Sequence, residues 1–415
     1  MSDEFIIEDS IKIIKSDETF YNPAQEINRN LTKLVLKTYF KSVKEPIIFL
    51  VMEASGLRGI LLHKELNDAK ICINDILPEA VEMIKCNLKL NDIKEYKFVE
   101  NKFNFDENRI YISQQDCVSL MFNNSRCFNA IDIDPFGSSN VFIAAAINAV
   151  KNGGLLCFTC TDRGSLHTFV GKCFVKYDTK IKCNFDESEM ELRVLLSYIS
   201  RTAAKYDCSI EPLISLDVDY YLRVFVKVKR GSGNNSKKQN SFFYFCNSKN
   251  RKESNTKNNL CEVCGEQMDF YGPFWNKNLQ NSEFISSVLN ELTETGENKR
   301  LIGMLKCMKQ EIRIPFTYNL HDFGKVFKFE GIKLKKLMSV LYNSEYQVSL
   351  VHHSANSFKT NAPYKIIIDI CRAIINKDSS KYNLNKNEEI ENLFKVNYYR
   401  GLFKSNIGPG KILNK

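Results

Sequence analysis

Short apolar runs alternate with amphipathic stretches through the first half of the chain. The runs are four to eight residues long, the usual length of a buried strand. The stretches between them carry apolar residues at i, i+3 and i+4 spacing, and one of them opens with Pro78, a residue favoured at the first helical position. The predicted strands are 46–53, 70–75, 110–113, 130–133 and 155–159, and the predicted helices begin at 57, 78 and 140.

Strands that alternate with helices predict an α/β fold with a parallel sheet covered on both faces, as in Rossmann-like domains. Sheets of this kind bind their ligands at the carboxyl ends of the strands. A further helix is predicted over 189–206. Residues 210–216 and 220–229 then predict a pair of strands at an antiparallel edge.

Two polar segments, 231–240 and 249–259, have no apolar periodicity. They predict a domain boundary at about residue 231, with one domain over 1–230 and a smaller α+β domain over 231–415. Helical patterns in the second domain cover 283–292, 299–312, 332–343 and 362–376.

Composition and charge narrow the functional classes. The chain has 415 residues, 44% of them hydrophobic, which excludes collagen, coiled coil and wholesale disorder. No apolar run approaches the roughly 20 residues of a membrane span. Residues 1–230 hold 30 basic and 32 acidic side chains, whereas residues 231–415 hold 28 and 17. A near-neutral half joined to a basic half indicates chemistry in the first and a grip on a polyanion in the second.

The chain start and the cysteines bear on location. The sequence begins Met1-Ser-Asp-Glu-Phe5, which is acidic and unlike a secretory or mitochondrial leader. Its fourteen cysteines are scattered through apolar patterns, so we expect reduced thiols in the cytosol or nucleus. The sequence predicts neither secretion nor membrane insertion, and it indicates no obligate protein partner.

The predicted strands end in residues that suit a nucleoside cofactor. Small residues fill the segment from Glu53 to Gly59 after the first strand, so a ligand can lie against backbone there. Asp75 ends the second strand, where a carboxylate accepts hydrogen bonds from ribose hydroxyls. Asp116 follows the third strand, where an acid commonly meets an adenine amino group. No glycine-rich diphosphate loop is present, which favours S-adenosylmethionine over a dinucleotide.

The segment Asp134-Pro135-Phe136-Gly137 follows the fourth strand and predicts an amino-methylation site. The exocyclic amine of a nucleobase is a poor nucleophile because its lone pair is delocalised into the ring. Asp134 and the carbonyl of Pro135 can each accept one N–H and aim that lone pair at a methyl donor. Phe136 offers a face for stacking the base, and Gly137 allows close approach. Asp132 is predicted to be structural and to face the other side of the sheet.

With these motifs the sequence resembles the tRNA guanosine-26 N2-dimethyltransferase family. The resemblance runs from about residue 20 to 372. It is carried by 20–30, 53–60, 74–81, 134–137, 161–162, 221–226, 272–275 and 356–363.

The resemblance implies a class I S-adenosylmethionine-dependent methyltransferase domain that makes N2,N2-dimethylguanosine in tRNA. It implies that Asp134, Pro135 and Phe136 are catalytic, and that the cofactor is held by Arg29, Arg58, Asp75, Asp116 and Cys117. A plain interpretation of Arg29 and Arg58, as surface or carboxylate-paired arginines, stays open. A nuclear location is expected from the family, with the cytoplasm as the alternative.

Cys261-Glu-Val-Cys264-Gly has the spacing of a zinc knuckle. Structural zinc takes four ligands, and many family members supply a second CxxC upstream, where this chain has only Cys246. We therefore expect a degenerate knuckle, either with zinc on Cys246, Cys261, Cys264 and an unknown fourth ligand, or stabilised by packing without metal.

Two other functions stay open from the sequence alone. One is a guanine N2-methyltransferase that acts on another nucleic acid, such as rRNA or DNA. The second is an RNA-binding factor without turnover, which the presence of Arg58, Asp75, Asp116 and Asp134 makes less attractive.

Overall fold

The computed structural model describes residues 4–15, 21–183, 185, 187–253, 259–295, 298–329 and 331–376. Three sequence predictions fall partly outside the described residues, at Phe20, at 254–258 and at 377–415. The chain divides into two compact units. The first comprises Met1–Thr161, Ile199–Glu211 and Arg223–Asn234, and the second comprises Asp162–Tyr198, Pro212–Leu222 and Asn235–Lys415.

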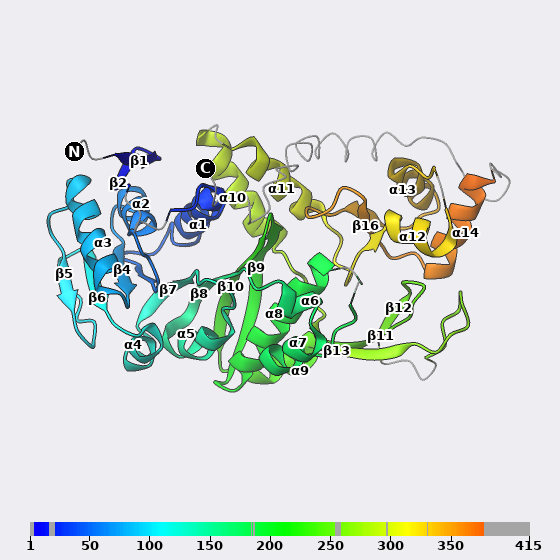
Figure 1. Cartoon of the computed structure of the whole chain (residues 1–415), viewed down its shortest axis with the longest axis horizontal. Helices are drawn as coiled ribbons and strands as arrows, with labels where there is room; N and C mark the ends of the chain where they lie inside the picture. The colour runs from blue at the N-terminus through cyan, green and yellow to red at the C-terminus, as the bar shows by residue number, and fades with distance from the viewer. Residues whose placement is uncertain are drawn as a thin grey trace. The chain divides into compact units, whose positions relative to one another are not determined.

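An eight-stranded sheet in the order β5-β6-β4-β3-β7-β8-β10-β9 dominates the first half of the chain (Figure 1). The pairings from β5 through to β8 are parallel, which confirms the predicted α/β class. The predicted strands are all present. They are β3 (Ile47–Leu50), β4 (Lys70–Asp75), β6 (Ile110–Gln114), β7 (Phe128–Ile133) and β8 (Val150–Cys160), together with β5 (Lys97–Val99) at the edge.

Helices connect these strands, including the three predicted to begin at 57, 78 and 140; the helices that begin at 26 and 117 were not predicted. The connecting helices are α1 (Glu26–Tyr39), α2 (Leu57–Glu65), α3 (Pro78–Leu90), α4 (Cys117–Asn123), and α5 (Ile143–Ala149), which follows a 3-10 turn, η2 (Asn140–Phe142). Pro78 opens α3 at its first position, where the missing N–H costs nothing. Ile71, Cys72 and Ile73 of β4 are all fully buried, as in a sheet covered on both faces.

The close packing of α2 on β4 depends on Gly59. A Cβ at Gly59 would lie 2.5 Å from Cδ1 of Ile73. Just before the helix, Gly56 has a φ of 74°, which lets the chain turn sharply from β3 into α2. The small residues after β3 therefore serve the turn and the helix packing.

The strands β9 (Cys208–Val218) and β10 (Tyr221–Arg230) are joined by two residues, so they form an antiparallel hairpin at the edge, as predicted. A second hairpin, β1 (Phe5–Glu8) with β2 (Ile11–Ile14), was not predicted. It is held to α3 because Asn87 Oδ1 accepts from the backbone N–H of Ile14 at 2.9 Å. A 3-10 turn, η1 (Pro23–Gln25), leads into α1.

The later part of the chain contains two three-stranded sheets that the sequence did not predict. One has the order β12-β11-β13 and the other β14-β16-β15. Aromatic rings pack in the first of them, where Phe243, Phe245 and Phe274 surround Phe316. The strands are β11 (Asn240–Phe245), β12 (Arg251–Glu253), β13 (Asp269–Trp275), β14 (Tyr318–Asn319), β15 (Val348–Leu350) and β16 (Ser357–Thr360).

The four helical patterns predicted for this part are confirmed, and further helices are present. Residues 231–240, predicted as a polar segment, contain η3 (Gly233–Asn235) and α9 (Ser236–Gln239). No described helix has both the length and the apolar character of a membrane span. The other helices are α6 (Gly164–His167), α7 (Val170–Tyr177), α8 (Glu187–Ala204), α10 (Ser282–Thr295), α11 (Lys299–Gln310), α12 (Leu320–Phe327), α13 (Leu334–Asn343) and α14 (Tyr364–Ile375).

Candidate functional site

Four parallel strands end side by side, each with an acidic residue at or just after its end. The register pairs Asp75 of β4 with Gln114 of β6, and Leu50 of β3 with Asp132 of β7, so the carboxyl ends are nearly level. The structure therefore brings the predicted acids Asp75, Asp116 and Asp134 to one edge of the sheet, together with Glu53, which was not predicted as a site residue. In sheet order these acids are Asp116, Asp75, Glu53 and Asp134.

The turn Asp134-Pro135-Phe136-Gly137 follows β7 directly, with Pro135 buried and Phe136 exposed. Phe136 is 83% exposed, and the side chain of Asp134 is 20% exposed. The N–H of Gly137 donates to Oγ1 of Thr161 at 2.8 Å, and the N–H of Thr161 donates to the carbonyl of Gly137 at 2.9 Å. Because Thr161 lies at the end of β8, two neighbouring strand ends fix the turn while Asp134 and Phe136 stay accessible.

Arg58 connects two aspartates beneath this turn. It lies on α2, is 6% exposed, and donates from one terminal nitrogen to Asp132 Oδ2 and from the other to Asp134 Oδ2. The prediction that Asp132 faces the other side of the sheet is wrong. Side chains at i and i+2 share a face of a strand, and both carboxylates reach the same guanidinium.

Two further buried residues complete the cluster, and neither was predicted as part of the site. Arg223 of β10 is fully buried, with Nη2 at 2.8 Å from Asp132 Oδ1 and Nη1 donating to Thr159 Oγ1 at 2.9 Å. Asn28 of α1 donates to Asp134 Oδ2 at 3.4 Å. Arg223 had a signal in the sequence, because an arginine within an apolar strand needs a buried partner. Asn28 had none beyond its place in a family-like segment.

Burial and pairing move the pKa values in this cluster in opposite directions. Burial raises the pKa of Asp132, but the guanidinium groups of Arg223 and Arg58 outweigh it, and the net shift is downward. Burial raises the pKa of Glu53 to about 8, although Arg58 Nε lies 3.9 Å from its carboxylate. At neutral pH the site therefore holds a charged Asp132 beside a mostly protonated Glu53.

The predicted cofactor acids also make local backbone contacts. Asp75 Oδ2 accepts from the N–H of Ala54 at 2.9 Å, and its Oδ1 accepts from the N–H of Leu77 at 3.1 Å. Asp116 is the N-cap of α4, where Oδ1 accepts from the N–H of Ser119 at 2.8 Å. Cys117 is buried in the first turn of that helix, and burial raises the pKa of its thiol to about 11. These contacts fix the acids at the strand ends.

Arg29 lies on α1 and is paired with Glu8 of the N-terminal hairpin. Its Nε donates to Glu8 Oε1 at 2.6 Å, and its guanidinium lies 5.2 Å from the ring centre of Tyr21. Arg29 makes no hydrogen bond to Asp75 or Asp116; its partners are Glu8 and the carbonyl of Asn22. Both predicted cofactor arginines are thus paired with carboxylates, which is the plain interpretation that the sequence left open.

Two exposed apolar residues beside Asp75 were missed from the sequence. Ile76 is 60% exposed and Leu77 is 57% exposed, directly after the end of β4. Their signal was the apolar pair between a strand-ending acid and Pro78. An exposed apolar step at this edge of the sheet suits the flat face of a nucleoside base, so the residues present fit an adenosine-containing cofactor.

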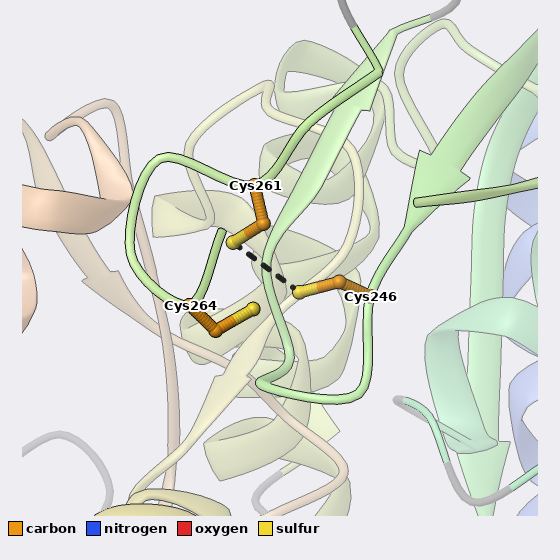
Figure 2. A group of neighbouring side chains, drawn as sticks. All are labelled: Cys246, Cys261 and Cys264. Carbon is orange, nitrogen blue, oxygen red and sulfur yellow. Dashed lines mark hydrogen bonds between the residues drawn. The ribbon is translucent and has the colours of Figure 1, made fainter. Parts of the chain in front are cut away.

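A second constellation consists of Cys246, Cys261 and Cys264, whose sulfur atoms all lie within 4.8 Å of one another. Figure 2 shows the three thiols pointing toward a common centre, with Cys246 Sγ at 3.5 Å from Cys261 Sγ. A tetrahedral zinc with Zn–S bonds of about 2.3 Å places its sulfurs about 3.8 Å apart. The predicted ligands are therefore brought together at a spacing that fits zinc.

Polar groups surround these thiols. Ser248 Oγ lies 2.8 Å from Cys246 Sγ, and Asn250 Nδ2 donates to Cys261 Sγ at 3.4 Å. Burial raises the pKa of Cys246, whereas for Cys261 the backbone N–H of Cys264 and the amide of Asn250 outweigh burial and lower it. Among the described residues, the group of possible metal ligands at this place consists of these three cysteines.

The position of a fourth thiol is filled by another residue type. Lys249 stands three residues after Cys246, where a second CxxC would place its cysteine, and its Nζ lies 3.2 Å from Asp322. The chain therefore departs from the four-cysteine pattern at the position that the sequence indicated.

Comparison with known proteins places these sites in context. The sequence model of the N2,N2-dimethylguanosine tRNA methyltransferase family matches residues 2–372. A tRNA (guanine(26)-N(2))-dimethyltransferase from Pyrococcus furiosus is 32% identical over 87% of this chain and 94% of its own. The protein of the same name from Drosophila melanogaster is 29% identical over 90% of this chain and 76% of its own.

A solved structure is similar to this chain over most of its length. Trm1 from Pyrococcus horikoshii in complex with S-adenosyl-L-methionine superposes with a TM-score of 0.78 at 30% identity. The match covers 88% of this chain and 99% of that protein. Sequence and fold thus point to one group of proteins over most of the described residues.

Proposed function

This chain belongs to the N2,N2-dimethylguanosine tRNA methyltransferase family, and we propose that Asp134 and its buried partners carry out the family's reaction. The protein is an S-adenosylmethionine-dependent tRNA (guanine-N2)-dimethyltransferase. The proposed product is N2,N2-dimethylguanosine at position 26 of tRNA. The observation that carries the assignment of residues is the accessible Asp-Pro-Phe-Gly turn, fixed at the carboxyl end of β7.

Asp134 is proposed to accept a proton from the reacting amine. Both Arg58 and Asn28 donate to Oδ2 of Asp134, so Oδ1 is the oxygen that faces away from these two donors. Oδ1 accepts one N–H of the guanine amine, and the carbonyl of Pro135 accepts the other. Together they draw the nitrogen toward sp3 geometry, and Asp134 takes the proton that the nitrogen releases.

Phe136 is proposed to stack against the target base. Its ring is 83% exposed on a turn whose backbone is fixed, so its exposure is a property of the site. Stacking of a base on an aromatic ring contributes roughly 1–3 kcal/mol. Gly137 has no side chain that could obstruct the base. The space around it is also open, because nothing lies within 4 Å of the place where a Cβ would be.

The cofactor is proposed to lie along the strand ends next to this turn. S-adenosylmethionine supplies the electrophilic methyl group. Arg29, Arg58, Asp75, Asp116 and Cys117 remain the proposed binding residues, and the exposed Ile76-Leu77 step adds a surface for adenine. Each carboxylate already holds its place through backbone N–H groups, which preorganises the acceptors.

The target guanine is proposed to leave the tRNA stack before methylation. An amine that must meet both Asp134 and Pro135 cannot do so while paired inside a helix. A 2-aminopurine at the target position should therefore brighten when the protein binds. Fluorescence that stays quenched in a complex that still methylates guanine would contradict flipping.

The basic domain predicted over 231–415 is proposed to hold most of the tRNA backbone. Its balance of 28 basic against 17 acidic residues suits phosphate contacts. Raising salt from about 50 to about 200 mM should then weaken tRNA binding by at least about tenfold. A flat salt response would exclude an electrostatic grip.

Zinc is proposed as a structural ion on Cys246, Cys261 and Cys264, which would supply three of its four ligands. The convergence of three sulfurs supports this, and Lys249 explains why the fourth ligand is not a cysteine. Elemental analysis should find about one zinc per chain, lost in Cys261→Ser and kept in Cys86→Ser, a control at an exposed cysteine. A zinc-free wild-type protein with full tRNA binding would favour a packed knuckle without metal.

A single assay tests the proposed reaction. Purified protein is incubated with unmodified tRNA transcript and S-adenosylmethionine, and the nucleosides are then identified by mass. Dimethylguanosine that disappears in Asp134→Ala supports both reaction and acceptor. Monomethylguanosine alone would reject the second transfer. No methyl product and no binding of S-adenosylhomocysteine, with tRNA still bound, would favour an RNA-binding factor.

The nuclear location stays a prediction that rests on the family. The absence of an obligate protein partner also stays a prediction. Imaging of a fluorescent fusion and sedimentation of the purified chain test these two expectations.

A further inference from the structure

The helix α7 (Val170–Tyr177) presents apolar side chains to solvent. Phe169, Val170, Phe174 and Val175 are 50%, 39%, 59% and 83% exposed, so four large exposed apolar residues lie within seven positions. Single exposed apolar residues are ordinary on a protein surface, whereas a contiguous group marks a contact surface.

The opposite face of α7 is firmly packed, so its exposed face is not the result of a loose helix. Cys173 and Tyr177, four residues apart, are fully buried. The ring of Tyr177 packs edge-on against Tyr198 at 5.6 Å. Just beyond the helix, Lys180 and Gly272 exchange two backbone hydrogen bonds of 2.9 Å, which tie the segment to β13.

Basic residues lie beside the apolar stripe. On a helix, positions four apart share a face, so Val170 and Phe174 form one row while Lys172 and Lys176 form another. Lys172 Nζ lies 4.6 Å from the ring centre of Phe169. The surface continues beyond the helix, where the ammonium groups of Lys180 and Lys182 lie 4.9 and 5.5 Å from the ring centre of Tyr271.

We propose that this surface, defined by Phe169, Val170, Lys172, Phe174 and Val175 and called the α7 surface, docks a segment of the tRNA substrate. Four lysines against one aspartate lie over residues 169–182, and although Lys176 pairs with Asp162, the remaining positive charge complements a polyanion. Exposed phenylalanine rings offer π-faces to unstacked bases, and the lysines contact the phosphates between them. This inference rests on the proposed function, since it takes tRNA as the occupant.

Along the chain, α7 follows closely on the strands that carry the proposed catalytic turn. The helix begins ten residues after β8 ends at Cys160. β8 is paired in parallel with β7, which leads directly into Asp134. The chain therefore passes from the strand beside the acceptor into the α7 surface with only the short α6 between them. The surface also lies outside the predicted basic domain over 231–415, so it would extend the grip on tRNA.

The test compares matched variants of the full-length protein. Phe174→Ser combined with Val175→Ser removes the centre of the α7 surface, and Lys172→Ala removes one charge. Phe98→Ser is the control, because Phe98 is 46% exposed on the edge strand β5 and also has a lysine, Lys85, 5.5 Å from its ring centre. Equilibrium tRNA binding, S-adenosylhomocysteine binding, methylation kinetics and sedimentation are measured for each protein.

The double variant should bind tRNA about tenfold more weakly and show a raised KM for tRNA. Its affinity for S-adenosylhomocysteine and its unfolding temperature should match wild type. Lys172→Ala should reduce the salt dependence of tRNA binding by about one ion. Tight tRNA binding by the double variant, equal to that of Phe98→Ser, would overturn the proposal.

Two other outcomes have distinct meanings. If the double variant loses self-association while its affinity for tRNA is unchanged, the α7 surface is an interface between copies of the chain and the proposal fails. If wild type binds tRNA without methylating it, the proposed function fails, while weaker binding by the double variant would still support the docking surface.

Discussion

The two units each contain a buried cluster of charged side chains, and the clusters differ in one respect. The arginine–aspartate cluster of the first unit consists of Arg58, Asp132, Asp134 and Arg223. Its members are buried except at one end, where the side chain of Asp134 is 20% exposed. One carboxylate of this cluster is therefore accessible to a substrate.

The side chains of the glutamate cluster of the second unit are all buried. The cluster consists of Glu189, Arg193, Glu311, His352 and Lys359, whose side chains are no more than 3% exposed. Lys359 Nζ lies 2.9 Å from Glu189 and 3.5 Å from Glu311. Burial raises the pKa values of both glutamates, but the cations around them outweigh it and lower each to about 2.

A functional site differs from a structural ion network in having a charged group that a substrate can reach. Both clusters contain strongly shifted groups, so perturbed pKa values alone do not identify function. The arginine–aspartate cluster has an accessible acceptor beside an exposed aromatic ring, whereas the glutamate cluster has only internal partners. We expect mutations in the first to affect catalysis and mutations in the second to affect stability.

The largest expected effect is that of Asp134→Asn. The amide keeps the shape of the side chain but cannot take up a proton. Methyl transfer measured in a single turnover at saturating tRNA should fall by about 10²–10⁴-fold. Binding of tRNA and of S-adenosylhomocysteine should stay within about twofold of wild type, as the control. A rate within about tenfold of wild type would remove Asp134 from the mechanism.

Lys359→Met should destabilise the second unit. It leaves the carboxylates of Glu189 and Glu311 buried with one fewer cation, so the free energy of unfolding should fall by about 3 kcal/mol. Urea unfolding measures this, with Lys70→Met as the control. Lys70 pairs with the exposed Glu45, and the loss there should stay below about 1 kcal/mol. A Lys359→Met variant with wild-type stability but reduced turnover would mean that the glutamate cluster, too, acts in function.

Arg58→Lys tests whether the arginine–aspartate cluster positions the proton acceptor, Asp134. A lysine has one ammonium group and cannot bridge Asp132 and Asp134 as the guanidinium does. We expect kcat to fall by about tenfold to a hundredfold, with little change in KM for tRNA. In the matched control Arg223→Lys the contact to Asp134 remains, so kcat should fall less. Equal losses in both variants would mean that Arg58 acts only through stability.

The sequence predicted the parallel strands, several of their connecting helices and the acids Asp75 and Asp116 after two strands, because burial on both faces of a sheet leaves a local periodic signature. Local spacing singled out the Asp134 turn and the Cys261–Cys264 pair, while Cys246 was added from the resemblance to the family. The sequence did not predict that Arg58, Asp132 and Asp134 form one cluster, because these contacts join positions 74 and 76 residues apart. Local patterns carry no information on such pairings, nor on the pairing of Arg29 with Glu8.

The short sheets of the second unit escaped prediction for a related reason. β14, for example, has only two residues, Tyr318 and Asn319, too few to show a period. The α7 segment was also missed, since its apolar residues lie on the exposed side and do not produce the usual pattern of a helix packed on a core.

The smallest expected effect comes from Glu53→Gln. Glu53 lies beside the arginine–aspartate cluster, and its effect on stability should change with pH in the opposite sense to that of the glutamates in the other cluster. The folded-state pKa of Glu53 is raised to about 8 by burial, above the ordinary value of 4.5. Between these values the folded state holds a proton that the unfolded state has lost, so wild-type stability falls as pH rises from about 4.5 to 8.

Glutamine removes this loss without changing the shape of the side chain. The difference in free energy of unfolding, variant minus wild type, should therefore grow by about 1 kcal/mol between pH 6 and pH 7. Urea unfolding of the cofactor-free protein at both pH values measures it. If the difference in free energy of unfolding is the same at both pH values, Glu53 is ionised in the folded state, as the glutamates of the glutamate cluster are.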